Sequence, residues 1–187
     1  MITMQKFFLE EALKVVDEHS IRASWIIEHM RGLIKAKESK IQEVESNSLV
    51  LSIVETYQEL DGKYEVNFIS SNNAPVKVQI DSTQFEIVLL NLLNNASEAI
   101  TQQETKPIIT LEISGENGEA EVTVANEGFL EHEESFNNLF AVKNSTKVNG
   151  LGLGLAIAAR VVERWGGQLS IRQHNKEVIS CILLPSL

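Results

Sequence analysis

Apolar and polar residues alternate along the chain with two different periods. Residues 4–37 carry apolar side chains at α-helical spacing and contain no proline, which predicts one long helix with a single apolar stripe. Helical spacing also predicts helices over 48–60, over 83–100 and after a glycine-rich strip that ends at Gly154. Short runs of β-prone residues, several strictly alternating, predict strands over 64–70, 76–80, 108–114, 120–126, 168–173 and 177–184.

Local signals indicate where these elements begin and where the chain divides. Asp81 or Ser82 is expected to cap the helix over 83–100, and Ser46 or Ser48 the helix over 48–60. The polar segment 35–48 is expected to be a break. A solitary long helix followed by mixed helices and strands indicates two units, and we set them at residues 1–45 and 46–187.

Composition narrows the class of protein and its partners. Of the 187 residues, 43% are hydrophobic, which supports a packed core. The formal net charge of −10 argues against nucleic acid as a partner, because phosphate binding normally needs a basic face. Cys181, the single cysteine, lies in an apolar run and predicts a buried thiol in a reducing compartment. No apolar run approaches the roughly 20 residues that span a bilayer, so we expect a soluble, cytoplasmic piece.

Residues 149–167, NGLGLGLAIAARVVERWGG, combine a glycine strip with an amphipathic helix. Gly150, Gly152 and Gly154 lie at the helix start, where free N–H groups favour an anion and glycines let a phosphate approach the backbone. The strip is not a Walker loop, since no Gly-Lys-Ser/Thr follows, and not a dinucleotide fingerprint, since position 155 is leucine. Taken alone, it is equally consistent with a phosphate site and with a tightly packed hinge.

The helix over 83–100 has a polar face rich in asparagine. Asn91, Asn94, Asn95 and Glu98 occur at i, i+3, i+4 and i+7, opposite an apolar face. Asparagine is a mediocre helix former, so its repetition indicates a function. An amide oxygen can bind Mg²⁺ on a nucleotide without adding negative charge, although a merely solvated face is the alternative.

A third polar element, Asn126-Glu127-Gly128, follows an alternating strand. Its polar side chain and glycine can contact one edge of a ligand ring, or they can form an ordinary turn. Taken alone, this segment favours the ordinary turn.

In this order, the three elements resemble the catalytic, ATP-binding domain of sensor histidine kinases, the Bergerat (GHKL) fold shared with gyrase B, MutL and a class of heat-shock chaperones. DSTQFEIVLLNLLNNASEAI resembles the family's N box, VTVANEGFL its first glycine box, SFNNLFAVKNSTK its F box and lid, and GLGLGLAIA its second glycine box. The resemblance covers nearly the whole chain. It implies an α+β fold, a two-layer α/β sandwich whose mixed β-sheet is covered by about three helices, preceded by the long N-terminal helix.

The resemblance also implies a binding site for ATP and Mg²⁺. Asn95 falls on the family's metal ligand, with Asn91 one turn earlier in support, and Asn126 with Gly128 falls on the adenine contact. The lid is expected at Thr146 and Lys147, with Lys143 a weaker candidate, and the phosphates at the glycine strip. The full implied set is Asn91, Asn95, Asn126, Gly128, Thr146, Lys147, Gly150, Gly152, Gly154 and Leu155.

The sequence departs from the family pattern at three positions. Asn126 replaces the usual aspartate, so the acceptor for the adenine amine is neutral. Leu130 replaces the second glycine of that box, and Leu151 a threonine of the other. These departures motivate an alternative, a nucleotide-insensitive scaffold of the same fold, against which the Asn91/Asn95 pair argues. An ATPase of the gyrase B or MutL type is disfavoured, because Asn91 stands where those enzymes need a glutamate base.

The implied activity is that of a two-component protein-histidine kinase, with relay of the phosphate to an aspartate of a response-regulator receiver domain. The helix over 4–37 resembles the second helix of the dimerisation and phosphotransfer hairpin, through which the parent would form a homodimer. His19 and His29 in this helix lack the acidic and proline followers of the phosphate acceptor, and His132 and His174 lie in the lid and a hairpin turn. We expect the acceptor before residue 1, in a longer membrane-associated parent, and no autophosphorylation by this chain alone.

Overall fold

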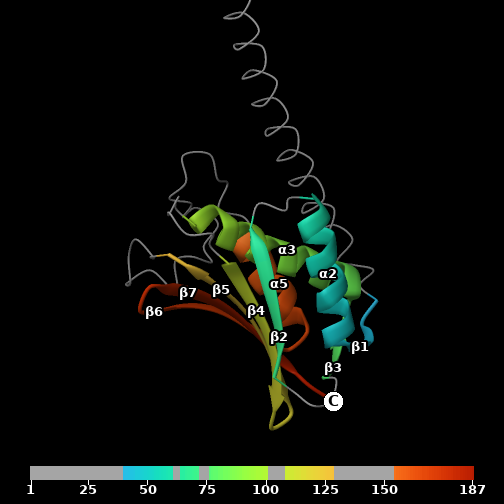
Figure 1. Cartoon of the computed structure of the whole chain (residues 1–187). Helices are drawn as coiled ribbons and strands as arrows, with labels where there is room; N and C mark the ends of the chain where they lie inside the picture. The colour runs from blue at the N-terminus through green and yellow to red at the C-terminus, as the bar shows by residue number, and fades with distance from the viewer. Residues whose placement is uncertain (1–39, 61–63, 72–75, 101–107, 129–153) are drawn as a thin grey trace, which may run out of the picture. The chain divides into compact units, whose positions relative to one another are not determined.

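The computed structural model describes residues 40–60, 64–71, 76–100, 108–128 and 154–187 (Figure 1). The chain divides into two compact units, Met1–Glu38 and Ser39–Leu187, and every described residue lies in the second. The predicted helix over 4–37 therefore lies outside the described residues. No helix among the described residues is both long enough and apolar enough to cross a membrane.

Within these ranges, the helices and strands follow the order that the sequence patterns predict. The helices are α2 (Ser46–Leu60), α3 (Ser82–Ala99) and α5 (Gly154–Arg164). The strands are β1 (Gln42–Glu45), β2 (Glu65–Ser70), β3 (Lys77–Ile80), β4 (Ile108–Glu116), β5 (Glu119–Glu127), β6 (Gln168–His174) and β7 (Glu177–Pro185). Every predicted element of the second unit is confirmed, with its ends shifted by no more than a few residues.

Five of the described strands form one mixed sheet in the order β2-β4-β5-β7-β6. β2 runs parallel to β4, and the remaining neighbours are antiparallel. β1 and β3 form a small antiparallel sheet, which a single bridge from Val78 to Ser186 connects to the end of the chain. The three helices lie over one face of the large sheet (Figure 1). The predicted two-layer α+β architecture is therefore confirmed for the described residues.

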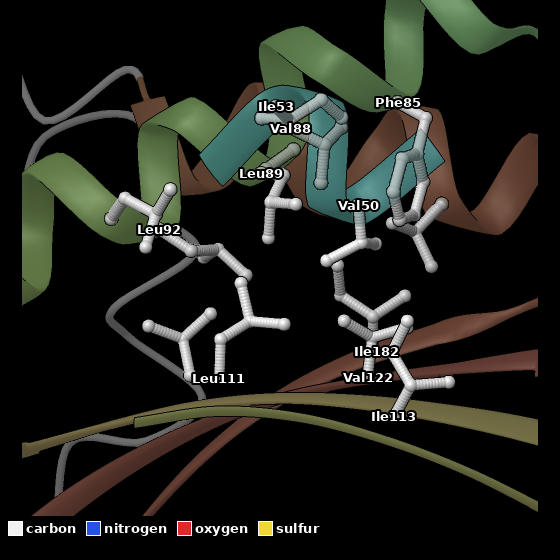
Figure 2. Close-up of a cluster of buried hydrophobic side chains, with 14 of the residues drawn as sticks. Val50, Ile53, Phe85, Val88, Leu89, Leu92, Leu111, Ile113, Val122 and Ile182 are labelled. Atoms are coloured by element: carbon white, nitrogen blue, oxygen red, sulfur yellow. The ribbon is translucent and has the colours of Figure 1, made fainter. Parts of the chain in front are cut away.

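The core lies between this face and the helices. Because side chains of a strand alternate between its two faces, the alternate residues Ala120, Val122 and Val124 of β5 are all buried. Figure 2 shows aliphatic side chains of α2 and α3 above those of the sheet, with Val50, Ile53, Val88, Leu89 and Leu92 facing Leu111, Ile113, Val122 and Ile182. This layer fixes α3, and with it the polar face of α3, relative to β4 and β5.

One strand was not predicted from the pattern. Gln42–Glu45 forms β1 and pairs with β3, although this segment looked like a polar break. Val44 is the single apolar residue in QEVE, so the run is too short to show a period of two. The compact unit thus includes residues that precede the predicted boundary at residue 46.

The start of α2 corrects a predicted cap. The Glu45 carboxylate accepts hydrogen bonds from the Ser48 backbone N–H at 3.3 Å and from the Ser48 hydroxyl at 2.5 Å. The buried Ser46 hydroxyl instead donates to the Val76 carbonyl at 2.9 Å. The expectation that Ser46 or Ser48 caps α2 was therefore wrong, because the carboxylate satisfies the free N–H group while Ser46 ties the helix to the segment before β3.

The buried thiol was predicted correctly. Cys181 lies in β7 with its side chain largely buried, and its Sγ–H group donates to Glu121 Oε1 at 3.0 Å. Burial, followed by the hydrogen bond to Glu121, raises the pKa of the Cys181 thiol to about 12. The group is therefore a protonated thiol at neutral pH.

Candidate functional site

The polar face of α3 begins from a well-defined helix start. Asp81 caps the helix, since its Oδ1 atom accepts from the Gln84 backbone N–H at 3.0 Å, which confirms one of the two predicted caps. Nearly three turns after Asp81, Asn91 is buried, and Asn95, about one turn later, is half-buried. These asparagines lie at i and i+4 on a helix whose other face is packed against the sheet, so their amides occupy one edge of the helix.

The end of β5 holds the second polar element. Asn126 is only 5% exposed, and its Nδ2 atom donates to the Glu127 carbonyl at 3.0 Å. The Gly128 N–H donates to the Lys176 carbonyl at 2.9 Å. The chain leaving β5 is thereby fastened to the turn between β6 and β7, which holds Asn126 in place.

The C-terminal end of α3 and the end of β5 lie next to each other. A Cβ atom added to Gly128 would lie 3.6 Å from the Ala99 carbonyl of α3 and 3.2 Å from Asn126 Nδ2. The absence of a side chain at residue 128 therefore keeps this junction narrow. The structure brings together the end of the asparagine-bearing helix, Asn126 and Gly128.

The position of α5 is set by its packing against α3. Helix α5 packs against α3, and Phe85 in the first turn of α3 contacts Trp165 after the end of α5, with ring centroids 6.2 Å apart. Gly154 lies eleven residues before Trp165, or about 16 Å along a helix, so it begins α5 at the end opposite this ring contact. Gly154 and Leu155 are half-buried there. Four further predicted site residues, Thr146, Lys147, Gly150 and Gly152, lie outside the described residues, as does Lys143.

The described residues can contribute some of the ligands of a hard cation such as Mg²⁺, with a bound small molecule contributing the others. Among them, no three His, Cys, Asp or Glu side chains form a group that could hold a metal ion. The amide oxygens of α3 are neutral oxygen donors, which can complete the coordination of Mg²⁺ when phosphate oxygens supply the remaining ligands. The free N–H groups in the first turn of α5 favour the binding of an anion. The arrangement therefore fits a nucleotide with its Mg²⁺ ion better than a metal ion bound by protein alone.

A shallow hollow lies at the other end of the sheet. It has a volume of about 420 Å³ and is lined by Glu119, Gly166, Gly167, Gln168, Leu183, Leu184 and Pro185. Glu119 and Asn126 lie at opposite ends of β5, so this hollow is separate from the asparagine site. Its lining has no cluster of convergent polar side chains, and we assign it no role.

Two contacts of the site were not predictable from the sequence. The carbonyls of Glu127 and Lys176 accept the hydrogen bonds that hold Asn126 and Gly128. Backbone carbonyls belong to every residue, so no residue type signals them. The one indication was Asn175 in the turn between β6 and β7, where asparagine tolerates the observed φ of 56°.

Comparison with known proteins identifies the family. The family model for histidine kinase-, DNA gyrase B- and HSP90-like ATPases matches residues 80–186. The sensor protein FixL of Bradyrhizobium diazoefficiens is 30% identical over 164 residues, which cover 86% of this chain and 32% of FixL. The sensor histidine kinase ZraS of Escherichia coli is 24% identical over 193 residues, covering 97% of this chain and 41% of ZraS. The chain thus spans less than half the length of these relatives.

Solved structures agree with this assignment. The catalytic domain of histidine kinase ThkA has a TM-score of 0.69 at 26% identity, covering 78% of this chain and 95% of that domain. The structure of ThkA in complex with the response regulator TrrA has a TM-score of 0.70 at 21% identity, covering 90% of this chain and 49% of that one, and shows the shared fold. The chain belongs to the family of histidine kinase-, DNA gyrase B- and HSP90-like ATPases. Within that family it carries the ATP-binding catalytic domain of the sensor histidine kinases.

Proposed function

We propose that this chain binds ATP together with Mg²⁺ and transfers the γ-phosphate to a histidine side chain, from which a response-regulator aspartate receives it. The observation that supports the proposal is the junction between the end of α3 and the end of β5. The C-terminal half of α3 carries Asn91 and Asn95, the end of β5 carries Asn126, and α5, which begins at Gly154, packs against α3. The family match over residues 80–186 includes all three.

The residues take distinct roles in this proposal. Asn95 binds the metal ion through its amide oxygen and Asn91 supports it, while Asn126 and Gly128 contact adenine. Gly150, Gly152 and Gly154 present backbone N–H groups to the phosphates, Leu155 follows in the first turn of α5, and Thr146 and Lys147 cover the nucleotide as a lid. Phosphoryl transfer depends mainly on positioning and on charge neutralisation, and Mg²⁺ supplies part of the latter when bound. No carboxylate base is needed on α3, which agrees with asparagine at position 91.

The relatives support the partners that we propose. We propose that the phosphate-accepting histidine is not among these 187 residues, since the histidines present lack the sequence context of an acceptor. The kinase ThkA forms a complex with the response regulator TrrA, and we propose a receiver domain as the partner of this chain. We further propose homodimerisation through the helix predicted over 4–37, with residues 1–45 serving the hairpin and 46–187 the catalytic domain. The site of action would be the cytoplasm, where ATP is available and Cys181 stays reduced.

Calorimetric titration with ADP and a non-hydrolysable ATP analogue, with and without Mg²⁺, tests the binding step. We expect saturable binding that depends on Mg²⁺ and weakens at least roughly tenfold in Asn95→Ala, because one metal ligand is lost. Asn95 is half-buried and outside the apolar core, so the free energy of unfolding should change by less than about 1 kcal/mol.

Asn67→Ala is the matched control, since Asn67 is an exposed asparagine of β2 on the opposite face of the sheet. This variant should bind like the wild-type chain. If calorimetry of a folded wild-type chain detected no heat of binding at millimolar nucleotide, the scaffold interpretation would replace the kinase proposal.

A further inference from the structure

The turn between β6 and β7 consists of Asn175 and Lys176, and it lies beside the end of β5 (Figure 1). Asn175 has a left-handed backbone conformation, with a φ angle of 56°. The Gln173 side chain fastens this conformation, because its Nε2 atom donates a hydrogen bond to the Asn175 carbonyl at 3.1 Å. Residues other than glycine seldom adopt such a φ angle, and those that do cluster at functional sites.

The residue after Asn175 holds the end of β5. The Lys176 carbonyl accepts a hydrogen bond from the Gly128 N–H group at 2.9 Å. Gly128 in turn lies against the end of α3, because a Cβ atom at this residue would be 3.6 Å from the Ala99 carbonyl. Ala99 follows Asn95 by about one helical turn. Through one hydrogen bond, the turn therefore determines how the end of β5 lies against the helix that carries the proposed metal ligand.

The hairpin at the opposite end of β5 has the same construction. Asn117, in the turn between β4 and β5, has a φ angle of 55°. The carbonyl of the next residue, Gly118, accepts a hydrogen bond from the Ser186 N–H group at 2.9 Å. The two turns thus share an asparagine, a left-handed backbone and a carbonyl that holds a neighbouring segment, but only the turn at Asn175 holds a segment of the proposed site.

Building on the proposed function, we infer that Asn175 is a positioning residue for the nucleotide. Its left-handed backbone directs the Lys176 carbonyl toward the Gly128 N–H group, and this hydrogen bond holds the end of β5 in the place that the nucleotide requires. A residue that opposes this φ angle would turn the carbonyl away and leave the Gly128 N–H group without its acceptor. Asn175 is itself exposed and acts through its backbone, so nucleotide affinity depends on a residue outside the proposed binding set.

Three variants test this inference by titration with a non-hydrolysable ATP analogue and Mg²⁺. Asn175→Val should weaken binding roughly fivefold, because a β-branched residue opposes the left-handed backbone and the bond to Gly128 is lost. Asn175→Gly should stay within about twofold of the wild-type affinity, because glycine adopts this φ angle freely. Asn117→Val is the matched control, since it should lower the urea midpoint as Asn175→Val does and leave the affinity unchanged.

Two readouts separate positioning from a general loss of stability. Calorimetry reports stoichiometry and affinity separately, so a partly unfolded sample lowers the stoichiometry, whereas a displaced Gly128 lowers the affinity. Hydrogen exchange of the Gly128 amide, followed by nuclear magnetic resonance without nucleotide, monitors the bond to Lys176 directly. Protection of this amide should fall in Asn175→Val and persist in Asn175→Gly and Asn117→Val. If Asn175→Val does not fold, Asn175→Ala should show the same changes to a smaller degree.

The outcomes separate the inference from the proposed function. Wild-type affinity in a folded Asn175→Val chain would overturn the inference while leaving nucleotide binding intact. An equal loss of affinity in Asn117→Val would also overturn it, because strain anywhere in the sheet would then suffice. A loss of affinity in Asn175→Gly would do the same, because the side chain rather than the backbone would then act. A folded wild-type chain that binds no nucleotide would overturn the proposed function, and the inference with it.

Discussion

The two ends of the large sheet use asparagine and glycine for different purposes. At one end, Asn117 and Gly118 adopt φ angles of 55° and 83° and turn β4 into β5. At the other end, Asn126 keeps an extended strand position and contributes a buried side chain, while Gly128 lies outside the left-handed region. The same residue types thus serve backbone geometry at one end and a candidate binding site at the other.

The glycines show the difference most clearly. At the turn end, α5 stops in a Schellman motif, in which Gly166 N–H bonds the Glu163 carbonyl and Gly167 N–H bonds the Val162 carbonyl. A Cβ atom on Gly167 would lie 2.3 Å from the Leu183 carbonyl oxygen. At the site end, a Cβ atom on Gly128 would meet a side-chain amide at 3.2 Å. Substitutions at the turn end should therefore change stability, and those at the site end should change binding.

Gly167→Ala should give the largest effect on stability. The added Cβ would overlap backbone that cannot move without disturbing β7, and overpacking of this kind costs about 3 kcal/mol. Urea unfolding, followed by far-ultraviolet circular dichroism, measures the loss. If the free energy of unfolding of Gly167→Ala stayed within roughly 1 kcal/mol of the wild-type value, the scale of an ordinary surface change, β7 would be able to shift and make room for the new Cβ atom.

Gly118→Ala is the matched control at the same end of the sheet. No atom lies within 4 Å of the Cβ position, but the φ angle is 83°. Only the left-handed backbone conformation opposes this change, at a cost of about 1 kcal/mol. The difference between the two variants therefore isolates the effect of space from the effect of conformation.

Asp81→Ala should produce an intermediate loss. Asp81 accepts hydrogen bonds from the backbone N–H groups of Gln84 at 3.0 Å and Lys40 at 2.8 Å, and removal of such a cap costs about 1 kcal/mol. The capped end of α3 lies beside Trp165, away from the asparagines, so nucleotide affinity should not change. Thermal unfolding and titration on the same sample check both statements.

Asp81→Ser is the control for that variant, because serine keeps a capping oxygen. It should recover most of the lost stability. If Asp81→Ala instead weakened nucleotide binding as much as folding, the two ends of α3 would be coupled and the proposed division of tasks would be wrong.

The sequence predicted the elements of this fold well because its patterns are local and long. The apolar face of α3 recurs over eighteen residues, and strands such as β4 and β5 alternate over nine. Asp81 could be identified as a cap because its spacing to the helix is itself a local signal. The strand β1 was not predicted because it forms through a tertiary contact, its pairing with β3. A four-residue polar segment carries no sequence pattern that indicates such pairing.

The candidate site was predictable in its residue types and not in its geometry. Asparagine inside a helix is unusual enough to be noticed, which singled out Asn91 and Asn95. The orientation of the Asn126 amide depends on a backbone carbonyl, and the junction at Gly128 depends on how the end of α3 meets β5. Both require three-dimensional placement that one-dimensional spacing does not contain.

Gly128→Ala should have the smallest effect on stability and still alter recognition. The φ angle at residue 128 is open to alanine, and replacing glycine also lowers the entropy of the unfolded chain, so the free energy of unfolding should change by less than about 0.5 kcal/mol. The new Cβ would lie 3.2 Å from Asn126 Nδ2, so the amide must shift and its hydrogen bond to the Glu127 carbonyl must weaken. Titration should therefore show weaker binding of ATP. A Gly128→Ala chain that loses stability like Gly167→Ala, with its affinity for ATP unchanged, would remove the distinction between the two ends of the sheet, because both glycines would then serve packing alone.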